Sequence, residues 1–162
     1  AGDNGLALGQ HGLMGKQNCY DHSLRVPLVL SGPGVPKGER RDAFCYLLDI
    51  YPTLCVLLCL DAPASVEGRS LVPVLASPEA TVRETVFGAY RRLQRTVRER
   101  RFKLIEYKVR GARTTQLFDM VADPWERNDL SSAPEHAGHV ARLRERLKTW
   151  QAELDDDADI LP

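Results

Sequence analysis

The chain has 162 residues, 43% hydrophobic and 27% charged, a composition typical of globular proteins rather than of disordered, collagenous or membrane classes. Lys and Arg number 22 together, as do Asp and Glu, so the formal net charge is zero and no global basic field favours nucleic acid. No apolar run approaches the ~18 residues that a membrane span requires.

The first part of the chain reads as a loop, a strand and a helix. Residues 1–17 contain five glycines without sustained periodicity, which indicates a loop. Residues 26–31 are apolar and rich in β-branched side chains, so they are predicted to form a buried strand in a sheet covered on both faces. Residues 48–60 predict a helix with Asp49 as N-cap, and we expect it to be buried because it is apolar nearly all round. Residues 70–75 begin another short element.

The pattern changes at Thr85 to short segments of strand character, which predict antiparallel hairpins over residues 85–90, 94–98, 102–109 and 114–120. A helical spacing of apolar residues follows, formed by Val140, Leu143, Leu147, Trp150 and Leu154. This amphipathic helix is expected to cover the sheet. The acidic residues 155–159 are expected to be frayed and solvated.

These elements predict an α/β fold class with two parts. Residues 1–80 are expected to be the closing part of an α/β sheet domain, and residues 81–162 a smaller subdomain of a four-stranded antiparallel sheet with a C-terminal helix. Because an α/β sheet with a single evident strand is incomplete, the sequence favours a piece of a longer domain, unless further strands escape the pattern.

The four cysteines form no CxxC pair and have no zinc-finger spacing with the histidines. We expect buried free thiols. Cys55 and Cys59 lie on one helix face, where the helix geometry disfavours a disulfide between them.

Three residues near the N-terminus have side chains suited to an ionic site. Asp3 and Asn4 stand together in a glycine-flanked loop and can present carboxylate and amide oxygen to a hard cation such as calcium, although an Asp-Asn-Gly triplet by itself indicates a turn. Lys16, in another glycine-flanked turn, can place an ammonium beside an anion held near that cation, although a loop lysine is ordinarily solvated.

The combined pattern is more specific than any of these residues. The stretch DNGLALGQHGLMGKQNCYDHSLRVPLVLSGPGVPKG resembles the metal-binding segment of the sulfatase family, within the alkaline phosphatase superfamily. The resemblance continues in the same order through LLDIYPTLCVLL, EGRSLVPVL, RRFKLIEY and LFDMVADPWERNDL. It covers nearly the whole chain, from Asp3 to about Leu147.

The resemblance implies roles for particular residues. Asp3 and Asn4 correspond to calcium ligands that follow a strand of the central sheet, and Lys16 corresponds to the lysine that contacts the sulfate group. His11 corresponds to a histidine that reaches substrate in some relatives, and a structural role for it is equally open. Calcium and a fixed ammonium suit this chemistry because negative charge builds on the leaving oxygen of a sulfate ester.

Further along, the family places an acidic residue at Asp21 and a recurrent arginine at Arg25, which we interpret as a buried pairing partner rather than a ligand. In some carbohydrate sulfatases, the region of Arg91, Arg92 and Arg95 shapes the outer pocket, where arginine suits a second anionic group of a polymer. A solvated hairpin surface is the alternative for these arginines.

The chain departs from the family in one decisive respect. The family requires a Cys or Ser in a C/S-x-P-x-R motif, which matures to the formylglycine nucleophile, and no Cys or Ser here has that context. The upstream acidic ligands and the catalytic histidine and lysine of the family are absent too. We therefore expect this chain alone to be inactive. Among smaller departures, Cys59 stands where a helix-ending glycine is common, which places the helix cap in doubt.

The resulting functional hypothesis is a piece of a calcium-dependent sulfatase that acts on sulfated small molecules or carbohydrates. Alternatives are a phosphodiesterase or phosphonate hydrolase of the same superfamily, and a non-catalytic module that binds sulfated glycans. The family implies an extracytoplasmic location, whether periplasmic, secreted or lysosomal. The identity of the substrate and the oligomeric state stay open.

Overall fold

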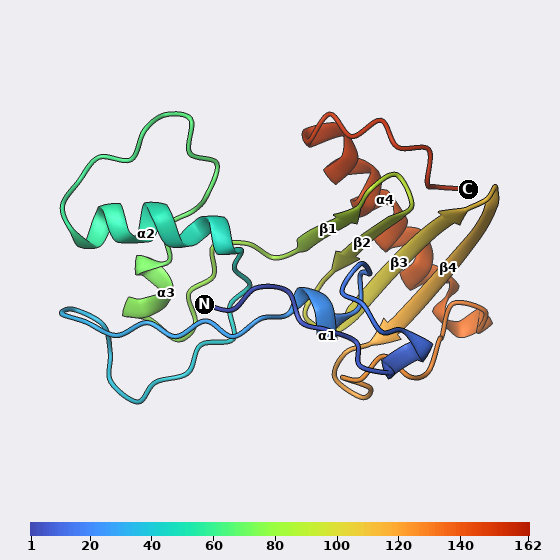
Figure 1. Ribbon diagram of the computed structural model, residues 1–162, viewed down its shortest axis with the longest axis horizontal. Coiled ribbons are helices and arrows are strands. Elements are labelled where there is room, and N and C mark those ends of the chain that lie inside the picture. The colour runs from blue at the N-terminus through green and yellow to red at the C-terminus, as the bar shows by residue number, and fades with distance from the viewer. The chain divides into compact units, whose positions relative to one another are not determined.

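The computed structural model describes all 162 residues, which divide into two compact units (Figure 1). One unit comprises residues 2–27 and 87–162, and the other comprises Ala1 and residues 28–86. This division differs from the boundary expected at residues 80 and 81, because the first loop groups with the sheet. The assignment of residues 1–80 to the α/β domain of a longer protein stays a prediction.

The first unit is built on a four-stranded antiparallel sheet, as predicted (Figure 1). Its strands, in the order β1-β2-β3-β4, are β1 (Val86–Tyr90), β2 (Gln94–Arg98), β3 (Phe102–Val109) and β4 (Ala112–Asp119). Val109 pairs with Ala112, so Arg110 and Gly111 form a two-residue hairpin loop in which both have positive φ. Such a loop matches the right-handed twist of the flanking strands.

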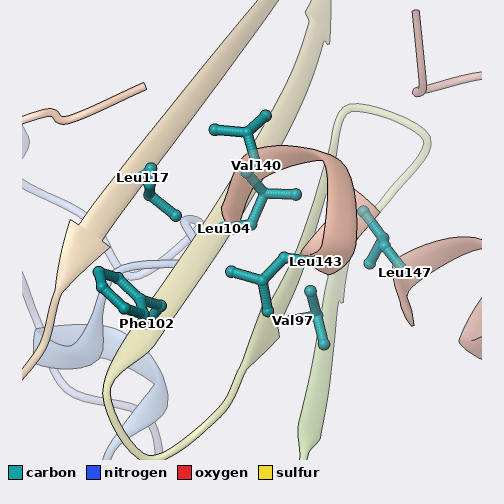
Figure 2. Packing of buried hydrophobic residues seen from close by; sticks show 7 residues of the cluster. All are labelled: Val97, Phe102, Leu104, Leu117, Val140, Leu143 and Leu147. Carbon is teal, nitrogen blue, oxygen red and sulfur yellow. The ribbon is translucent and has the colours of Figure 1, made fainter. Parts of the chain in front are cut away.

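One face of this sheet is covered by α4 (Ala137–Glu153), which follows the short 3₁₀ helix η3 (Pro134–His136). Figure 2 shows the aliphatic side chains of α4 against those of the strands. The cluster consists of Val97, Phe102, Leu104, Leu117, Val140, Leu143 and Leu147. Burial of this apolar stripe is the main force that holds the helix on the sheet, and the predicted amphipathic helix is confirmed.

The other face is covered by the N-terminal segment, which contains η1 (Gln10–Gly12) and α1 (Asp21–Leu24). Side chains alternate along a strand, so Ile105 points away from α4. Its cluster contains Cys19, Tyr20, Phe118 and Met120 as well. The N-terminal segment therefore contributes Cys19 and Tyr20 to the cluster on this face of the sheet.

The acidic C-terminal residues are held against the sheet, so the expectation of a frayed end is wrong. Asp156 accepts two hydrogen bonds from Arg95, at 2.5 Å to Oδ2 and 2.6 Å to Oδ1. Ala158 and Ile160 are buried. Paired charge and apolar burial together fix this end of the chain.

The second unit contains three helical elements, namely η2 (Leu47–Asp49), α2 (Ile50–Leu57) and α3 (Val72–Ala76). Two predicted elements, the helix within residues 48–60 and the short element near residues 70–75, are confirmed. The strand predicted over residues 26–31 is wrong. No strand pairs with this segment, and extended backbone becomes a strand only where its N–H and C=O groups find a ladder partner.

Asp49 precedes α2 but does not cap it through its side chain. Its buried carboxylate accepts hydrogen bonds from the Arg69 backbone N–H and from Arg83 Nη2, each at 2.8 Å. Burial opposes ionisation of Asp49, yet these hydrogen bonds and the Arg83 charge lower its pKa below the usual value. The residue therefore ties separate segments of this unit together.

The predicted all-round burial of α2 is wrong. Thr53 and Cys55 are buried, whereas Tyr51, Leu54 and Val56 are exposed. Within this unit α3 packs against α2 on one side, so the remaining apolar side chains of α2 stay uncovered.

The helix cap at Cys59 forms although the residue is not glycine. Leu60 N–H donates to the Cys55 carbonyl and Cys59 N–H to that of Val56, which is the Schellman pattern, and Cys59 adopts a φ of 55°. Cys19 and Cys55 are buried as expected, but Cys45 and Cys59 are exposed, and all four are free thiols. Exposure of Cys59 follows from its place in the cap, outside the helix.

Candidate active-site segment

The N-terminal segment is held in place by backbone contacts with residues 23–27. Gly2 N–H donates to the Pro27 carbonyl at 3.1 Å, and Gly5 N–H donates to the Ser23 carbonyl at 3.2 Å. A Cβ at Gly5 would lie 2.1 Å from the His22 carbonyl oxygen, so only glycine fits. The residues between these contacts are thereby fixed, although they form a loop and not the strand end that was predicted for Asp3 and Asn4.

Asp3 and Lys16 are brought together by this segment. Lys16 Nζ donates to Asp3 Oδ2 at 2.7 Å, and Asn4 N–H donates to Asp3 Oδ1 at 2.6 Å. The hydrogen bond from Lys16 is the largest cause of a lowered Asp3 pKa, followed by the hydrogen bond from Asn4 N–H and the Lys16 charge. Asp3 is thus a carboxylate at neutral pH, and it faces solvent.

Asn4 is oriented through its amide nitrogen, since Nδ2 donates to the Ser23 carbonyl at 2.9 Å. An amide whose nitrogen is bound in this way presents its oxygen in a defined direction. Asp3 and Asn4 therefore offer adjacent oxygen ligands on a short, fixed loop.

Lys16 lies at the base of a closed loop and His11 at its tip. Ala7 N–H donates to the Gly15 carbonyl at 3.1 Å, and Gly9 N–H donates to the Leu13 carbonyl at 2.8 Å, which closes the loop. His11 has a φ of 53° inside it. The structure brings Lys16 to Asp3, but it shows no contact between Lys16 and His11.

His11 packs in an aromatic stack that the sequence does not predict. Its ring lies 3.9 Å from the Tyr20 ring with an interplanar angle of 1°, and 5.6 Å from the His22 ring. Burial lowers the pKa of His22, and the nearby His11 and Lys103 lower it further. His22 is therefore disposed to stay neutral near pH 7, whereas His11 is exposed.

Asp21 forms two ion pairs with residues of the sheet, whereas the sequence identified it only as a family position. Lys103 Nζ donates to Asp21 Oδ1 at 2.8 Å, and Arg98 binds Asp21 Oδ2. Burial opposes the charge on Asp21, but the Lys103 and Arg98 charges prevail and lower its pKa. No local pattern reveals these partners, because they lie 77 and 82 residues further along the chain.

Arg25 is exposed and makes no ion pair, so its interpretation as a buried pairing partner is wrong for this structure. The acidic residue of the same motif, Asp21, pairs instead with residues of the sheet.

Two of the three arginines expected at an outer pocket or a solvated surface are bound by the chain's own C-terminal residues, whereas Arg91 is exposed. Arg92 pairs with Asp157 at 2.6 Å, and Arg95, which is buried, pairs with Asp156. The solvated reading is therefore wrong for Arg95.

Comparison with known proteins supports the family resemblance. The family described as N-sulphoglucosamine sulphohydrolase, C-terminal, matches residues 9–153. A sulfatase of Formosa agariphila is 30% identical over 155 residues, which are 93% of this chain and 30% of that protein.

Solved structures agree with the sequence match. A protein in complex with its substrate D-glucosamine-2-N,6-O-disulfate has a TM-score of 0.84 at 27% identity, covering 96% of this chain and 34% of that one. The phosphonate monoester hydrolase of Agrobacterium radiobacter has a TM-score of 0.76 at 26% identity, covering 93% and 34%. The chain thus spans about a third of the length of the proteins that it matches. It belongs to the sulfatase family and corresponds to the C-terminal region described by the matching family model.

Proposed function

We propose that this chain supplies one side of the active site of a calcium-dependent sulfate ester hydrolase. The observation that carries the proposal is the contact of Asp3 with Lys16, at 2.7 Å, within the segment that resembles the family's metal-binding loop. A carboxylate and an ammonium at this distance can divide two tasks. The carboxylate attracts a cation, and the ammonium attracts the sulfate oxygens beside it.

Asp3 and Asn4 would hold calcium through their side-chain oxygens. Calcium takes six to eight oxygen ligands, so two residues supply only part of a site. The chain shows no group of three or more His, Cys, Asp or Glu side chains placed to hold a metal. The donor types of Asp3 and Asn4, carboxylate and amide oxygen, suit a hard cation. The remaining ligands would come from residues outside these 162. When bound, calcium would neutralise charge on the sulfate group.

Lys16 would bind the sulfate group directly. Its hydrogen bond to Asp3 holds the ammonium in place, and a fixed positive charge stabilises a transition state in which negative charge grows. His11, exposed at the tip of its loop and stacked on Tyr20, would contact the remainder of the substrate.

The nucleophile is absent from these residues, so we predict that the chain alone does not hydrolyse sulfate esters. Without a covalent nucleophile, water must attack sulfur directly. The test is incubation of the purified chain with an aryl sulfate and calcium. Turnover that depends on Lys16 would contradict the proposal.

In the full-length protein, Lys16→Ala should reduce turnover by a loss of about 2 to 4 kcal/mol of transition-state stabilisation, as for other oxyanion contacts. Asp3→Ala should chiefly weaken calcium retention. Lys37→Ala, at an exposed lysine of the other unit, is the matched control and should leave both unchanged. Unchanged kinetics in Lys16→Ala and Asp3→Ala would reject the assignment.

A second candidate within the superfamily is a phosphonate or phosphodiester hydrolase. The structural similarity to the phosphonate monoester hydrolase favours it. Assays of the full-length protein on an aryl sulfate and an aryl phosphodiester separate the two candidates by the ratio of their kcat/KM values.

For the sulfatase candidate, we propose a sulfated carbohydrate substrate, because the protein with the TM-score of 0.84 is described with a sulfated glucosamine. A glycan-binding module without catalysis has less support, since Arg92 and Arg95 are occupied by Asp157 and Asp156. An extracytoplasmic location stays a prediction from the family; no helix of the structure combines the length and apolar character needed to cross a membrane.

A further inference from the structure

A buried cluster of charged side chains lies between the sheet and the candidate site. Lys103, on β3, is 1% exposed, and its Nζ lies 2.8 Å from Asp21 Oδ1 and 2.6 Å from Glu126 Oε1. Glu126, in the loop after β4, is 2% exposed and accepts a hydrogen bond from the Asp21 N–H at 2.6 Å. A single lysine thus joins two acids that lie 105 residues apart.

The backbone at Glu126 points to a specific role for its carboxylate. Glu126 has a φ of 55°, a conformation in which residues other than glycine are strained. Such strain persists where the surrounding contacts over-determine it. Here the carboxylate reaches both Lys103 and the start of α1, and burial raises its pKa above the usual value although the Lys103 charge opposes this rise. The contacts with Lys103 and α1 are therefore what hold Glu126 in place.

The cluster is linked to the proposed metal ligands through one turn of helix. Asp21 begins α1, and Ser23 lies within it. The Ser23 carbonyl accepts both the Asn4 side-chain N–H and the Gly5 N–H. Any movement of α1 consequently moves the residues that orient Asp3 and Asn4.

A buried ion cluster of this kind does not by itself imply stability, because well-packed apolar residues often serve as well. What charged partners provide is direction, since each hydrogen bond restricts the orientation of the group it contacts. The strand β3 already has an aliphatic cluster on its other face. A lysine at position 103, rather than an aliphatic residue, therefore orients α1 more than it stabilises the sheet.

We propose that Lys103 and Glu126 are positioning residues, which set the orientation of Asp3 and Asn4 through Asp21 and α1. The consequence for catalysis rests on the proposed function, whereas the consequence for the order of the segment does not. The sheet thereby takes part in the site without touching substrate.

The test compares hydrogen exchange of the backbone amides of residues 2–24 in the full-length protein and its variants, without added calcium. Lys103→Met removes the shared cation, and Lys103→Arg keeps a positive charge. In Lys103→Met these amides should exchange at least about tenfold faster, because opening of the segment no longer breaks the two ion pairs of Lys103, although the ion pair of Arg98 with Asp21 remains. Lys103→Arg should restore most of the protection. Calcium affinity, measured by calorimetry, should fall by about 10-fold to 100-fold in Lys103→Met, as for other residues that orient metal ligands.

Glu106→Gln is the matched control. Glu106 lies on the same strand and is fully buried, but it pairs with Arg144 on the face covered by α4. It should loosen β3, β4 and α4 and leave residues 2–24 unchanged. If Lys103 only stabilised the fold, Lys103→Met and Glu106→Gln would speed exchange in the same residues.

Unchanged exchange of residues 2–24 in Lys103→Met, or equal loosening in Glu106→Gln, would overturn the proposal. If Lys103→Met does not fold, Glu126→Gln replaces it, since it leaves the Lys103 to Asp21 ion pair in place; it should speed exchange in the same residues, and no change would again overturn the proposal. If the wild-type protein neither binds calcium nor cleaves sulfate esters, the proposed function fails, while the exchange comparison still decides whether Lys103 positions the segment.

Discussion

The two faces of the four-stranded sheet are covered in different ways. On one face, α4 places Val140, Leu143 and Leu147 against aliphatic residues of the strands (Figure 2). On the other face, a small cluster around Tyr20 and Ile105 adjoins the charges of Lys103, which is buried, and of Asp21, which is partly buried. The first face is covered by a regular element and the second by a loop segment that carries the candidate site.

This difference separates stability from orientation. Aliphatic contacts stabilise without specifying a direction, since the hydrophobic effect is non-directional. Hydrogen-bonded charges specify a direction at a cost in desolvation. The aliphatic contacts hold α4 on the sheet, and the charged contacts lie beside the segment that carries Asp3 and Asn4.

The strongest test of this comparison shortens the chain from each end in turn. Ending the chain before Pro134 removes α4 and exposes the cluster of Val97, Leu104 and Leu117. At roughly 25 cal/mol per Å² of apolar surface, this loss is large against the 5 to 15 kcal/mol by which typical domains are stable. Circular dichroism during thermal unfolding should show no cooperative transition of the sheet unit.

Removal of residues 1–17 is the counterpart on the other face. It leaves Cys19, Tyr20 and Asp21 in place, so the sheet unit should still unfold cooperatively. If both truncated chains fold, or if neither does, the two faces do not differ in the way described.

A single substitution tests the aliphatic face at finer scale. Leu143→Ala leaves a cavity at a fully buried position and should lower the free energy of unfolding by about 2 to 5 kcal/mol. Arg146→Ala, on the exposed side of the same helix, should change it by less than about 0.5 kcal/mol. Denaturant unfolding measures both, and equal losses would mean that α4 is not held by its apolar stripe.

The C-terminal residues add a charged contact to the face that α4 covers. The hydrogen bond from Arg95 is the largest cause of an Asp156 pKa lowered to about 2. Because the folded-state pKa lies below the unfolded value, the contact stabilises the folded protein above about pH 4, and this is lost as the pH falls through about 2. Asp156→Asn should therefore cost about 1.5 to 3 kcal/mol at pH 7 and almost nothing near pH 2.

Denaturant unfolding of both proteins across this pH range measures the effect. Asp155→Asn, at an exposed neighbour, is the control and should show no such pH dependence. A loss in Asp156→Asn that is the same at pH 7 and pH 2 would show that the Arg95 ion pair does not contribute.

The sequence predicted local patterns well and contacts between distant residues poorly. Strand alternation and helical spacing are local patterns, so β2 and β3 were predicted with their observed ends, and β1, β4 and α4 closely. The family resemblance predicted that Lys16 lies near Asp3, but not the direct ion pair between them. The charges at Asp21, Arg95 and Glu126 could not be paired in advance, because each partner is distant in sequence.

The failures of the sequence reasoning have physical causes too. Residues 26–31 have strand character, but a strand forms only with a partner, and none pairs with them here. The acidic end was expected to be frayed because its charges were considered apart from Arg92 and Arg95, although Asp155, Asp157 and Asp159 are exposed as expected. Composition describes a segment by itself, whereas burial depends on what the rest of the chain places against it.

The smallest predicted effect concerns the aromatic contact on the loop-covered face. Tyr20→Phe keeps the ring that stacks on His11 and packs near Phe118, and removes only the hydroxyl that lies 2.8 Å from Gln116 Oε1. Loss of one such hydrogen bond should lower the free energy of unfolding by about 0.5 to 1.5 kcal/mol in urea. Tyr51→Phe, on the exposed side of α2, is the matched control and should be neutral. A neutral Tyr20→Phe would mean that ring packing alone holds Tyr20 on the sheet. A loss as large as that of Leu143→Ala would mean instead that the loop-covered face depends on its polar contacts for stability as well as for orientation, which would break the distinction between the two faces.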